Sequence, residues 1–449
     1  MKTLKMIAAA LLACTAATPS LAADGPELRV GAAKVDITPK SNPLPGQFTG
    51  VLDPLYIRAI VVEDGGTRAA LVTVDAGAIG TDTWTYVTQR VAKELGIPAA
   101  NVLLTATHTH SVPFGPNKDA GAQIVEAIAS AAKTLRPGRF AYGSGVSYIN
   151  VNRNIIDPKT RRWWEGPNYD GPSDKTVAVV AFEDLAGKPI AVYYNYGVHA
   201  VLTGTLDLIS ADIPGASSNY IEKSMGPDVV AVWSTGAAGD QNPIFFNQTY
   251  ALRDIRIQDY AARGEDISNA MPPGGKGMDR TNPKVATLME QQKQMTLSMG
   301  QMLGEEVLHV VRDGLERPQT RATIRGASTS IQCPGRNRTD SGRAGFPGVY
   351  TDGDPVSIKL SMVRIGDVML GGVDGEVFTT IAQRFKRESP YKHTMMVTLT
   401  NGMARSGYIP NDAAFAQNTF EVVSSRLKPG CAEDKIVDGL LDLVAQTEK

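Results

Sequence analysis

Residues 69–110 read AALVTVDAGAIGTDTWTYVTQRVAKELGIPAANVLLTATHTH, and this stretch decides the fold. The apolar run 69–74 predicts a strand, and 81–95 predicts a helix that the sequence Gly-Ile-Pro stops. A second apolar strand follows at 102–104. Strand, helix and strand in this order form a βαβ unit. Its second strand leads directly into the motif Thr-His-Thr-His.

The same kind of alternation continues along the chain and predicts an α/β fold of layered mixed β-sheets flanked by helices. The length fits one large layered domain or two domains. Two polar stretches, 254–283 and 334–355, predict long loops. Further strands are expected at 28–30, 57–62, 177–182, 190–194, 229–233, 358–363, 368–372 and 395–399. Further helices are expected at 124–135, 285–316, 377–387 and 435–446.

The N-terminus is typical of an exported protein. Residues 1–5 contain two lysines, and the apolar run 6–14 is too short to span a bilayer. Small residues at 20–23 predict cleavage there, so we expect 1–23 to be a signal peptide and the protein to be periplasmic or secreted. A lipid anchor at Cys14 is the less favoured alternative. No later stretch reaches the run of roughly 18 apolar residues that a membrane helix needs.

Charge and cysteine content limit the partners. The formal net charge is −1, from 45 basic and 46 acidic residues, so nothing favours nucleic acid or an anionic membrane surface. We therefore expect no nucleic-acid partner and a small-molecule or lipid substrate; the oligomeric state is left open. After export, Cys333 and Cys431 remain, which permits one disulfide or two free thiols and excludes a cysteine-rich metal cluster.

Three of the five histidines, His108, His110 and His199, stand just past the ends of expected strands. Loops at such ends gather functional groups, and neutral imidazole is a common zinc ligand. In extended backbone, His108 and His110 point to the same side. For each histidine, a buried hydrogen bond with no metal is the alternative. His309 and His393 lack this context and are interpreted as structural or surface residues.

Two other charged residues are weaker candidates. Glu376 follows an apolar strand at the start of a helix, where a capping carboxylate is the alternative. Arg153 lies in the polar cluster Asn150–Asn154, whose alternative is an ordinary loop. The sequence has no Gly-x-Ser-x-Gly, no His-Glu-x-x-His and no phosphate loop. The residues alone predict a metal site on an exported α/β protein and name no substrate.

Eight motifs are spread over nearly all of the chain after the signal peptide. They are Val35-Asp36-Ile37-Thr38-Pro39, Asp53-Pro54-Leu55-Tyr56, Thr107-His108-Thr109-His110-Ser111-Val112-Pro113, Asn150–Asn154, Val198-His199, Ser210-Ala211-Asp212-Ile213-Pro214-Gly215, Gly239-Asp240-Gln241-Asn242-Pro243 and Gly375-Glu376. Together they resemble the neutral/alkaline non-lysosomal ceramidase family. The resemblance implies the α/β catalytic domain of that family, as one unit over 24–449 without the family's C-terminal immunoglobulin-like domain.

The resemblance also implies one zinc ion and its ligands. By motif, the family's metal residues fall on His108, His199, Glu376 and Tyr408, the last of these in Gly407-Tyr408-Ile409-Pro410. Without the resemblance, a core or rim position would explain Tyr408 equally well. His110 and Arg153 match family residues that face the amide and the developing oxyanion.

Two departures from the family pattern concern catalysis. A family serine in the Gly-Asp-x-x-Pro loop corresponds to Gln241, which cannot be a nucleophile, and a second family tyrosine falls on Phe420. The expected mechanism is therefore attack by metal-activated water. Asp240 or Gln241 is expected to orient the water or the leaving group.

Three functions follow as hypotheses. The first is a zinc-dependent amidase that acts on N-acyl sphingoid lipids. The second is a metal hydrolase of the same fold that cleaves another bond, glycosidic or non-lipid amide; the polar stretch Arg336–Arg343 and Gln241 lean towards it. The third is a binding protein without catalysis, which only the loss of the serine supports.

Overall fold

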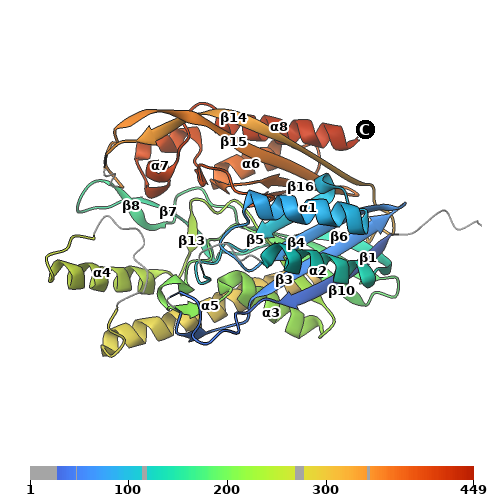
Figure 1. The fold of residues 1–449 in the computed structure, drawn as a ribbon, viewed down its shortest axis with the longest axis horizontal. Coiled ribbons are helices and arrows are strands. Elements are labelled where there is room, and N and C mark those ends of the chain that lie inside the picture. The colour runs from blue at the N-terminus through green and yellow to red at the C-terminus, as the bar shows by residue number, and fades with distance from the viewer. Residues whose placement is uncertain (1–27, 47, 114–118, 268–277, 341–343, 449) are drawn as a thin grey trace, which may run out of the picture.

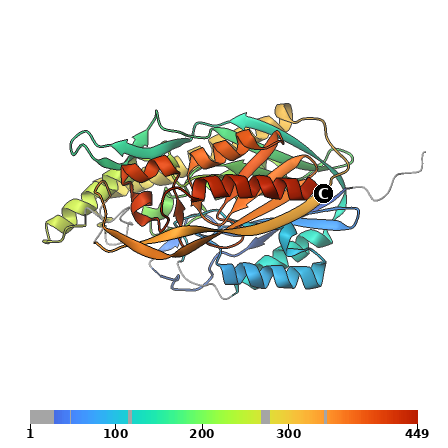
Figure 2. The same cartoon turned by 90° about the horizontal axis from the view of Figure 1, so that it is seen from above.

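The computed structural model describes residues 28–46, 48–113, 119–267, 278–340 and 344–448. The expected signal peptide and Cys14 lie outside these residues, as do 268–277 and 341–343 of the two expected loops. In the described part, two β-sheets pack face to face and helices cover both outer faces (Figures 1 and 2). The predicted α/β class is confirmed.

The larger sheet has eight strands in the order β12-β10-β9-β6-β1-β3-β4-β5. The pairs β4–β5 and β10–β12 are parallel and the other neighbours are antiparallel. The βαβ unit read from the sequence is thus present as β4, α1 and β5. The strands are β1 (Arg29–Asp36), β3 (Tyr56–Asp64), β4 (Thr67–Val74), β5 (Val102–Ala106), β6 (Arg136–Val146), β9 (Thr176–Asp184), β10 (Pro189–Tyr196) and β12 (Val230–Thr235).

The smaller sheet has four strands in the order β14-β15-β16-β18, and β16 pairs with β18 in parallel. In Figure 1 this orange and red part lies above the larger sheet. The strands are β14 (Ile324–Arg338), β15 (Tyr350–Ile365), β16 (Val368–Val373) and β18 (His393–Thr398).

Strands β4, β5, β10, β12, β16 and β18 are buried on both faces, which explains why they appear in the sequence as continuous apolar runs. Side chains alternate across each strand. On β4, Leu71 packs into the core between the sheets and Val72 into the core under the helices. On β16, Leu370 faces the larger sheet and Met369 faces the opposite core.

Helices form the two outer layers. Side chains of α1 and α2 pack against β3, β4 and β5, and those of α3 and α5 pack against β9, β10 and β12. Helices α6 and α8 cover the outer face of the smaller sheet, and Figure 2 shows α8 lying along it. These helices are α1 (Thr81–Leu95), α2 (Ala120–Lys133), α3 (Asp212–Met225), α5 (Pro283–His309), α6 (Thr379–Glu388) and α8 (Ala432–Glu448).

Short elements complete the described chain and hold most of the candidate site. Strands β7 and β13 pair antiparallel, as do β7 and β8, while β17 pairs with β19 and β2 with β11 in parallel. They are β2 (Gly50–Val51), β7 (Asn150–Ile156), β8 (Trp163–Asn168), β11 (Leu208–Ile209), β13 (Gln241–Pro243), β17 (Glu376–Val377), β19 (Tyr408–Ile409), α4 (Asn247–Ala261) and α7 (Phe420–Ser424).

The two expected long loops are partly regular structure, so these predictions were wrong in extent. Helix α4 extends into the start of 254–283, where Ile255 packs against a small apolar core that contains Leu252. The stretch 334–355 contains the ends of β14 and β15, which pair as one long hairpin with an irregularity between Cys333 and Gly335. These strand ends were not predicted, because they are rich in glycine and arginine and most of their residues lie outside the core.

Two expected helix ends also differ, and one segment that could have been a loop is a strand. The segment Arg136-Pro137-Gly138, expected to end a helix, begins β6 instead. The long helix ends at His309 and continues as a single π-helical turn, Val310–Gly314. Asn150–Asn154, for which a loop was the alternative, is strand β7.

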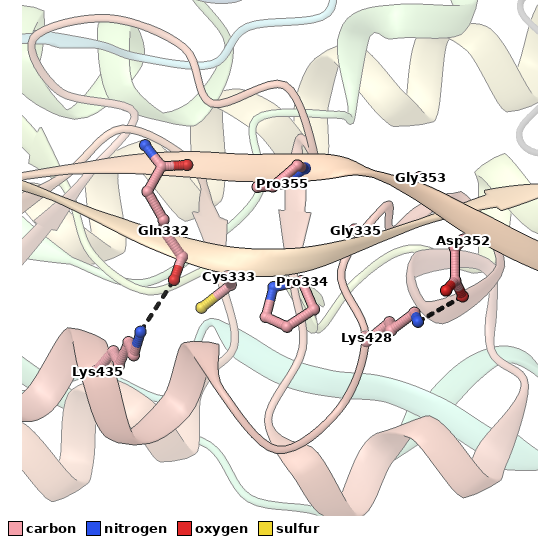
Figure 3. Close-up of a pocket in the computed structure, with 9 residues that line it drawn as sticks. All are labelled: Gln332, Cys333, Pro334, Gly335, Asp352, Gly353, Pro355, Lys428 and Lys435. Atoms are coloured by element: carbon pink, nitrogen blue, oxygen red, sulfur yellow. Dashed lines mark hydrogen bonds and ion pairs between the residues drawn. The ribbon is translucent and has the colours of Figure 1, made fainter.

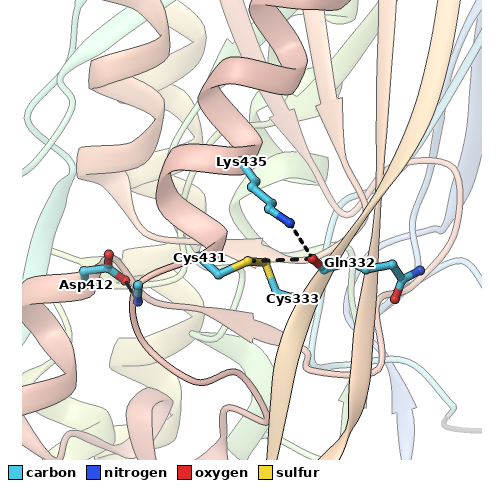
Figure 4. The surroundings of a disulfide bond; sticks show 6 residues. Gln332, Cys333, Asp412, Cys431 and Lys435 are labelled. Atoms are coloured by element: carbon cyan, nitrogen blue, oxygen red, sulfur yellow. Dashed lines mark hydrogen bonds between the residues drawn. A yellow bond between two sulfur atoms is a disulfide. The ribbon is translucent and has the colours of Figure 1, made fainter.

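Cys333 and Cys431 form a disulfide, which settles the alternative that the sequence left open (Figure 4). It joins β14 to the residue before α8. An open pocket lies beside it, and its lysines are both engaged: Lys428 pairs with Asp352, and Lys435 donates to the carbonyl oxygen of Gln332 (Figure 3). None of the predicted site residues lines this pocket.

Among the described residues, no helix combines the length and the apolar character needed to cross a membrane.

Candidate metal centre

The loop after β5 carries His108 and His110, and its backbone is fixed by segments far away in the sequence. Thr109 Oγ1 donates to the carbonyl oxygen of Ser210 at 2.7 Å, and the His110 amide donates to that of Ala200 at 3.1 Å. The backbone is not extended here, because His108 has a φ of +62°, a conformation that is uncommon outside glycine. The expected reason for a shared direction was therefore wrong, although both rings face one another with centroids 5.0 Å apart.

His199 follows β10 and reaches the same place from the opposite part of the larger sheet. Its amide donates to the carbonyl oxygen of Gln241 at 3.2 Å, and its side chain is 1% exposed. The ring centroids of His108 and His199 are 4.9 Å apart. Imidazole nitrogens of His108, His110 and His199 lie within 4.8 Å of one another.

Glu376 lies on β17, three residues after the end of β16 in the smaller sheet. The expectation that a helix begins at Glu376 was wrong, because α6 begins at Thr379. Strand β17 pairs with β19 so that Glu376 stands opposite Tyr408. The Glu376 Oε2 atom lies 3.1 Å from His108 Nε2 and 3.2 Å from His199 Nε2.

The other ring nitrogens of these two histidines contact backbone carbonyl oxygens. His108 Nδ1 lies 2.7 Å from the Gly77 oxygen, and His199 Nδ1 lies 2.6 Å from the Ala238 oxygen. A carbonyl oxygen only accepts hydrogen bonds, so each Nδ1 carries the proton. In the neutral rings, each Nε2 lone pair is directed at the Glu376 oxygen, as in metal-binding histidines held by an outer hydrogen bond.

These atoms fit a zinc-sized cation. Two ligand atoms that each lie about 2.0 Å from a tetrahedral ion are about 3.3 Å apart. The two nitrogen–oxygen distances to Glu376, 3.1 and 3.2 Å, are close to this spacing. The donor set of two imidazoles and one carboxylate also suits zinc.

Burial and neighbouring charges set the protonation of the cluster. Burial and the charge of Arg153 lower the pKa of His199 to about 4. Burial and the other two histidines hold the pKa of His110 well below its usual range. Burial opposes ionisation of Glu376, but His108 and His199 outweigh it and hold the Glu376 pKa well below its usual range. Burial opposes the charged form of His108, but Glu376 outweighs it and raises the pKa of His108. Near neutral pH, the cluster thus presents a carboxylate and the neutral rings of His110 and His199, whereas Glu376 favours the charged form of His108.

Tyr408 and Arg153 lie on the side of the site that the short strands β19 and β7 build. The Tyr408 ring stacks with His199 at 6.4 Å between centroids, and its hydroxyl accepts a hydrogen bond from Arg153 Nη2 at 3.1 Å. Arg153 lies on β7, where its amide donates to the carbonyl oxygen of Asp240 at 2.9 Å. Burial and the nearby Glu376 hold the pKa of Tyr408 well above its usual range.

Asp240 and Gln241 lie beside the cluster, but their side-chain atoms have other partners. The Asp240 oxygens accept hydrogen bonds from the Thr379 amide and from Asn152 Nδ2. The Gln241 amide donates to the carbonyl oxygen of Pro172 and accepts from Ser173 Oγ. Both residues are thus engaged in holding backbone segments around the site.

Two site residues were missed by the sequence reasoning. Asn242 Oδ1 accepts a hydrogen bond from Arg153 Nη1 at 3.3 Å, so Asn242 is the member of its loop whose side chain reaches this arginine. Glu421 Oε1 accepts a hydrogen bond from Arg153 Nε at 2.5 Å. Asn242 belongs to the motif Gly239–Pro243, so the sequence could have identified it as a site residue. Nothing in the local sequence around Glu421 predicts a role for it. His309 is exposed, and His393 is buried against Tyr142, as expected of structural or surface residues.

Comparison with known proteins gives one consistent result. Residues 44–249 match the family model of the neutral/alkaline non-lysosomal ceramidase N-terminal domain. Neutral ceramidase A of Dictyostelium discoideum is 30% identical over 233 residues, which are 44% of this chain and 32% of that protein. Neutral ceramidase of Pseudomonas aeruginosa is 30% identical over 306 residues, or 58% of this chain and 45% of that protein. The alignments thus span less than half of either relative.

Solved structures show the same fold. A structure described as ceramidase complexed with C2 matches 94% of this chain and 75% of its own chain, with a TM-score of 0.69 and 18% identity. The crystal structure of neutral ceramidase from Pseudomonas aeruginosa covers the same shares, with a TM-score of 0.68 and 19% identity. This chain is thus similar in sequence, over residues 44–249, to the N-terminal domain of the neutral/alkaline non-lysosomal ceramidases, and it shares the fold of solved neutral ceramidase structures.

Proposed function

We propose that the chain is a zinc-dependent hydrolase that cleaves the amide bond of an N-acyl sphingoid lipid, with water as the nucleophile. His108, His199, Glu376 and Tyr408 would hold one zinc ion. The observation that carries the proposal is the pair of contacts from one Glu376 oxygen to two Nε2 atoms, 3.1 and 3.2 Å, with both Nδ1 atoms on carbonyl oxygens.

Zinc, when bound, supplies a Lewis acid that polarises the scissile carbonyl and lowers the pKa of water from 15.7 to about 7. No nucleophilic side chain is then needed, which agrees with Gln241 at the position where the family resemblance places a serine. The proton that the water loses ends on the leaving nitrogen, so the products are a carboxylic acid and an amine.

His110 and Arg153 are proposed to stabilise negative charge on the amide oxygen. His110 Nε2 is buried and has no hydrogen-bond partner among the described residues, so it is available to donate one to substrate. Arg153 acts through the Tyr408 hydroxyl, to which its Nη2 donates. Removing one such donor from a developing oxyanion typically costs roughly 2.7–4 kcal/mol of transition-state stabilisation.

Asp240 and Gln241 are proposed as positioning residues. Asp240 holds the start of α6 through the Thr379 amide, and its backbone oxygen binds the Arg153 amide. The backbone oxygen of Gln241 binds the His199 amide, and its side chain holds Ser173. Both therefore fix residues that face the substrate.

A second candidate is a hydrolase of the same fold whose substrate is more polar than ceramide. The observation that favours it is the polar surroundings of Arg153. Asn242 contacts Arg153 and donates to Glu165, which in turn pairs with Arg253. This network offers amide and charged groups where an acyl chain would need apolar ones.

We also propose that residues 24–449 act as one catalytic domain and that the protein is exported. The shared packing of the two sheets supports the first statement. The second rests on the sequence of residues 1–23 alone.

The experiment is metal analysis of the purified protein followed by incubation with a fluorescent short-chain ceramide. One zinc per chain and release of fatty acid support the proposal. Zinc without fatty-acid release, together with cleavage of a polar amide or glycoside, supports the second candidate. Neither zinc nor turnover contradicts both and indicates a binding protein. Arg153→Met, with its zinc content measured alongside, should reduce kcat by about 10²- to 10³-fold.

A further inference from the structure

Glu421 is a buried acid to which the proposed chemistry gives no role. It lies in the first turn of α7 and is 1% exposed. Its Oε1 accepts the Arg153 Nε hydrogen at 2.5 Å, and its Oε2 is buried without a hydrogen-bond partner among the described residues. A buried carboxylate that bonds to one arginine through a single oxygen calls for an explanation, because burying a charge is costly.

The contact with Glu421 sets the direction of the whole guanidinium. The group is planar, so fixing Nε fixes where both terminal nitrogens point. Nη2 then donates to the Gly239 carbonyl oxygen at 2.7 Å and to the Tyr408 hydroxyl at 3.1 Å, while Nη1 donates to Asn242. Glu421 thus aims Nη2 at a residue of the metal centre.

The charge of Glu421 also matters to the cluster. Arg153 Nη2 lies 3.1 Å from the Tyr408 hydroxyl, and the Tyr408 ring stacks with His199, so the charge of Arg153 lies next to the cluster. An arginine with no counter-charge would oppose the binding of a divalent cation. Glu421 provides this counter-charge, because its Oε1 lies 2.5 Å from Arg153 Nε.

We infer that Glu421 is a positioning residue that directs Arg153 at the Tyr408 hydroxyl and balances its charge, so that a divalent cation can bind beside it. The inference rests on the proposed metal site but not on any substrate. The rival explanation is a purely structural ion pair that joins β7 to α7, and it predicts an effect on stability alone.

The test compares Glu421→Gln with Glu222→Gln in the full-length protein. Glu222 on helix α3 is a matched control. It is 6% exposed and pairs with the buried Arg58 of β3, outside the candidate site. Zinc affinity is measured by competition with a chelator, and the geometry of the site by the visible spectrum of the cobalt-loaded protein. Both readouts use metal alone.

We expect Glu421→Gln to weaken zinc binding by at least about tenfold and to change the cobalt spectrum, since like charges repel more strongly at low dielectric. Glu222→Gln should leave both unchanged, although it lowers the unfolding midpoint. The double variant Arg153→Met with Glu421→Gln removes both charges and should recover zinc affinity to within about threefold of wild type. Wild-type zinc affinity and spectrum in Glu421→Gln overturn the inference, as does an equal loss in Glu222→Gln.

If Glu421→Gln does not fold, Glu421→Asp takes its place. The shorter acid keeps the charge but moves the carboxylate by one methylene group, so zinc affinity should persist while the cobalt spectrum changes. An unchanged spectrum overturns the inference. If the wild type does not cleave ceramide, the inference about Glu421 still stands. If the wild type does not bind zinc, both this inference and the proposed metal site are overturned.

Discussion

Glu376 Oε2 lies 3.1 Å from His108 Nε2, although the two residues are 268 positions apart in the sequence. The end of β5 makes this possible. The Leu104 amide donates to Asn401 Oδ1, and Thr105 forms a bridge with Thr400, so the loop after β5 is fastened to the segment after β18. The candidate metal centre therefore depends on how the two sheets pack, and metal content reports on that packing as well as on the ligands.

His108→Ala and His199→Ala should each abolish stoichiometric zinc binding. Each variant removes one of the two imidazole nitrogens that face Glu376, and a single imidazole with the carboxylate and the phenol would no longer provide the nitrogen ligands that hold zinc in the proposed site. The check is zinc per chain after dialysis. His309→Ala is the control, because the side chain of His309 is 59% exposed and far from the cluster along α5. Stoichiometric zinc in His199→Ala would show that the ligand set is wrong.

Gln241→Ala should keep its zinc but lose stability. The side chain of Gln241 is fully buried and bonds to Pro172 and Ser173, and leaving these groups without partners costs about 1–3 kcal/mol. Urea unfolding measures the change, with the exposed Gln89→Ala on α1 as the control. Loss of zinc from Gln241→Ala at normal stability would instead place Gln241 among the groups that hold the metal.

Removing the disulfide by Cys333→Ala with Cys431→Ala should destabilise the fold and spare the metal. The bond closes a segment with a sequence separation of 98, for which chain entropy predicts a stabilisation of about 4–5 kcal/mol, with 2–4 kcal/mol typical. The unfolding midpoint of the wild type should fall in the same way under a reductant. A midpoint unchanged in both experiments would mean that the bond does not form.

Asp53 should make the protein less stable as the pH rises from 4 to 8. Burial raises the pKa of Asp53 to about 7 from an ordinary value near 4, so between these values the folded chain binds more protons than the unfolded chain. Stability is then fully present at the low end and is lost as the pH passes 7. Relative to Asp53→Asn, the wild type should lose roughly 3–4 kcal/mol across this range. Parallel stability curves for the two proteins would contradict the assignment.

The sequence predicted the parts of the site that follow apolar strands. β5 and β10 are buried on both faces, so their apolar runs were visible and placed His108 and His199 at strand ends. Arg153 was harder to place, because its strand β7 is buried among polar groups. Asn150 of β7 donates to the Asp174 and Gly197 carbonyl oxygens, so its buried amide is hydrogen-bonded. In the sequence, such a polar run is typical of a loop.

Tyr408 and Glu421 show what local sequence does not contain. Strand β19 is two residues long, and its partner β17 was not expected, so the alignment of Tyr408 with Glu376 has no periodic signal. The family resemblance identified Tyr408 by motif alone. Glu421 lies in a five-residue helix, and its partner Arg153 is 268 positions away, so only the tertiary packing reveals the pair.

The most direct measurement is a crystal structure of the zinc-loaded protein with anomalous scattering recorded above and below the zinc edge. We expect one anomalous peak, within about 2.0–2.2 Å of His108 Nε2, His199 Nε2 and a Glu376 oxygen, with the Tyr408 oxygen alongside. A structure at saturating zinc with no peak among these atoms, or with the peak elsewhere, would contradict the account.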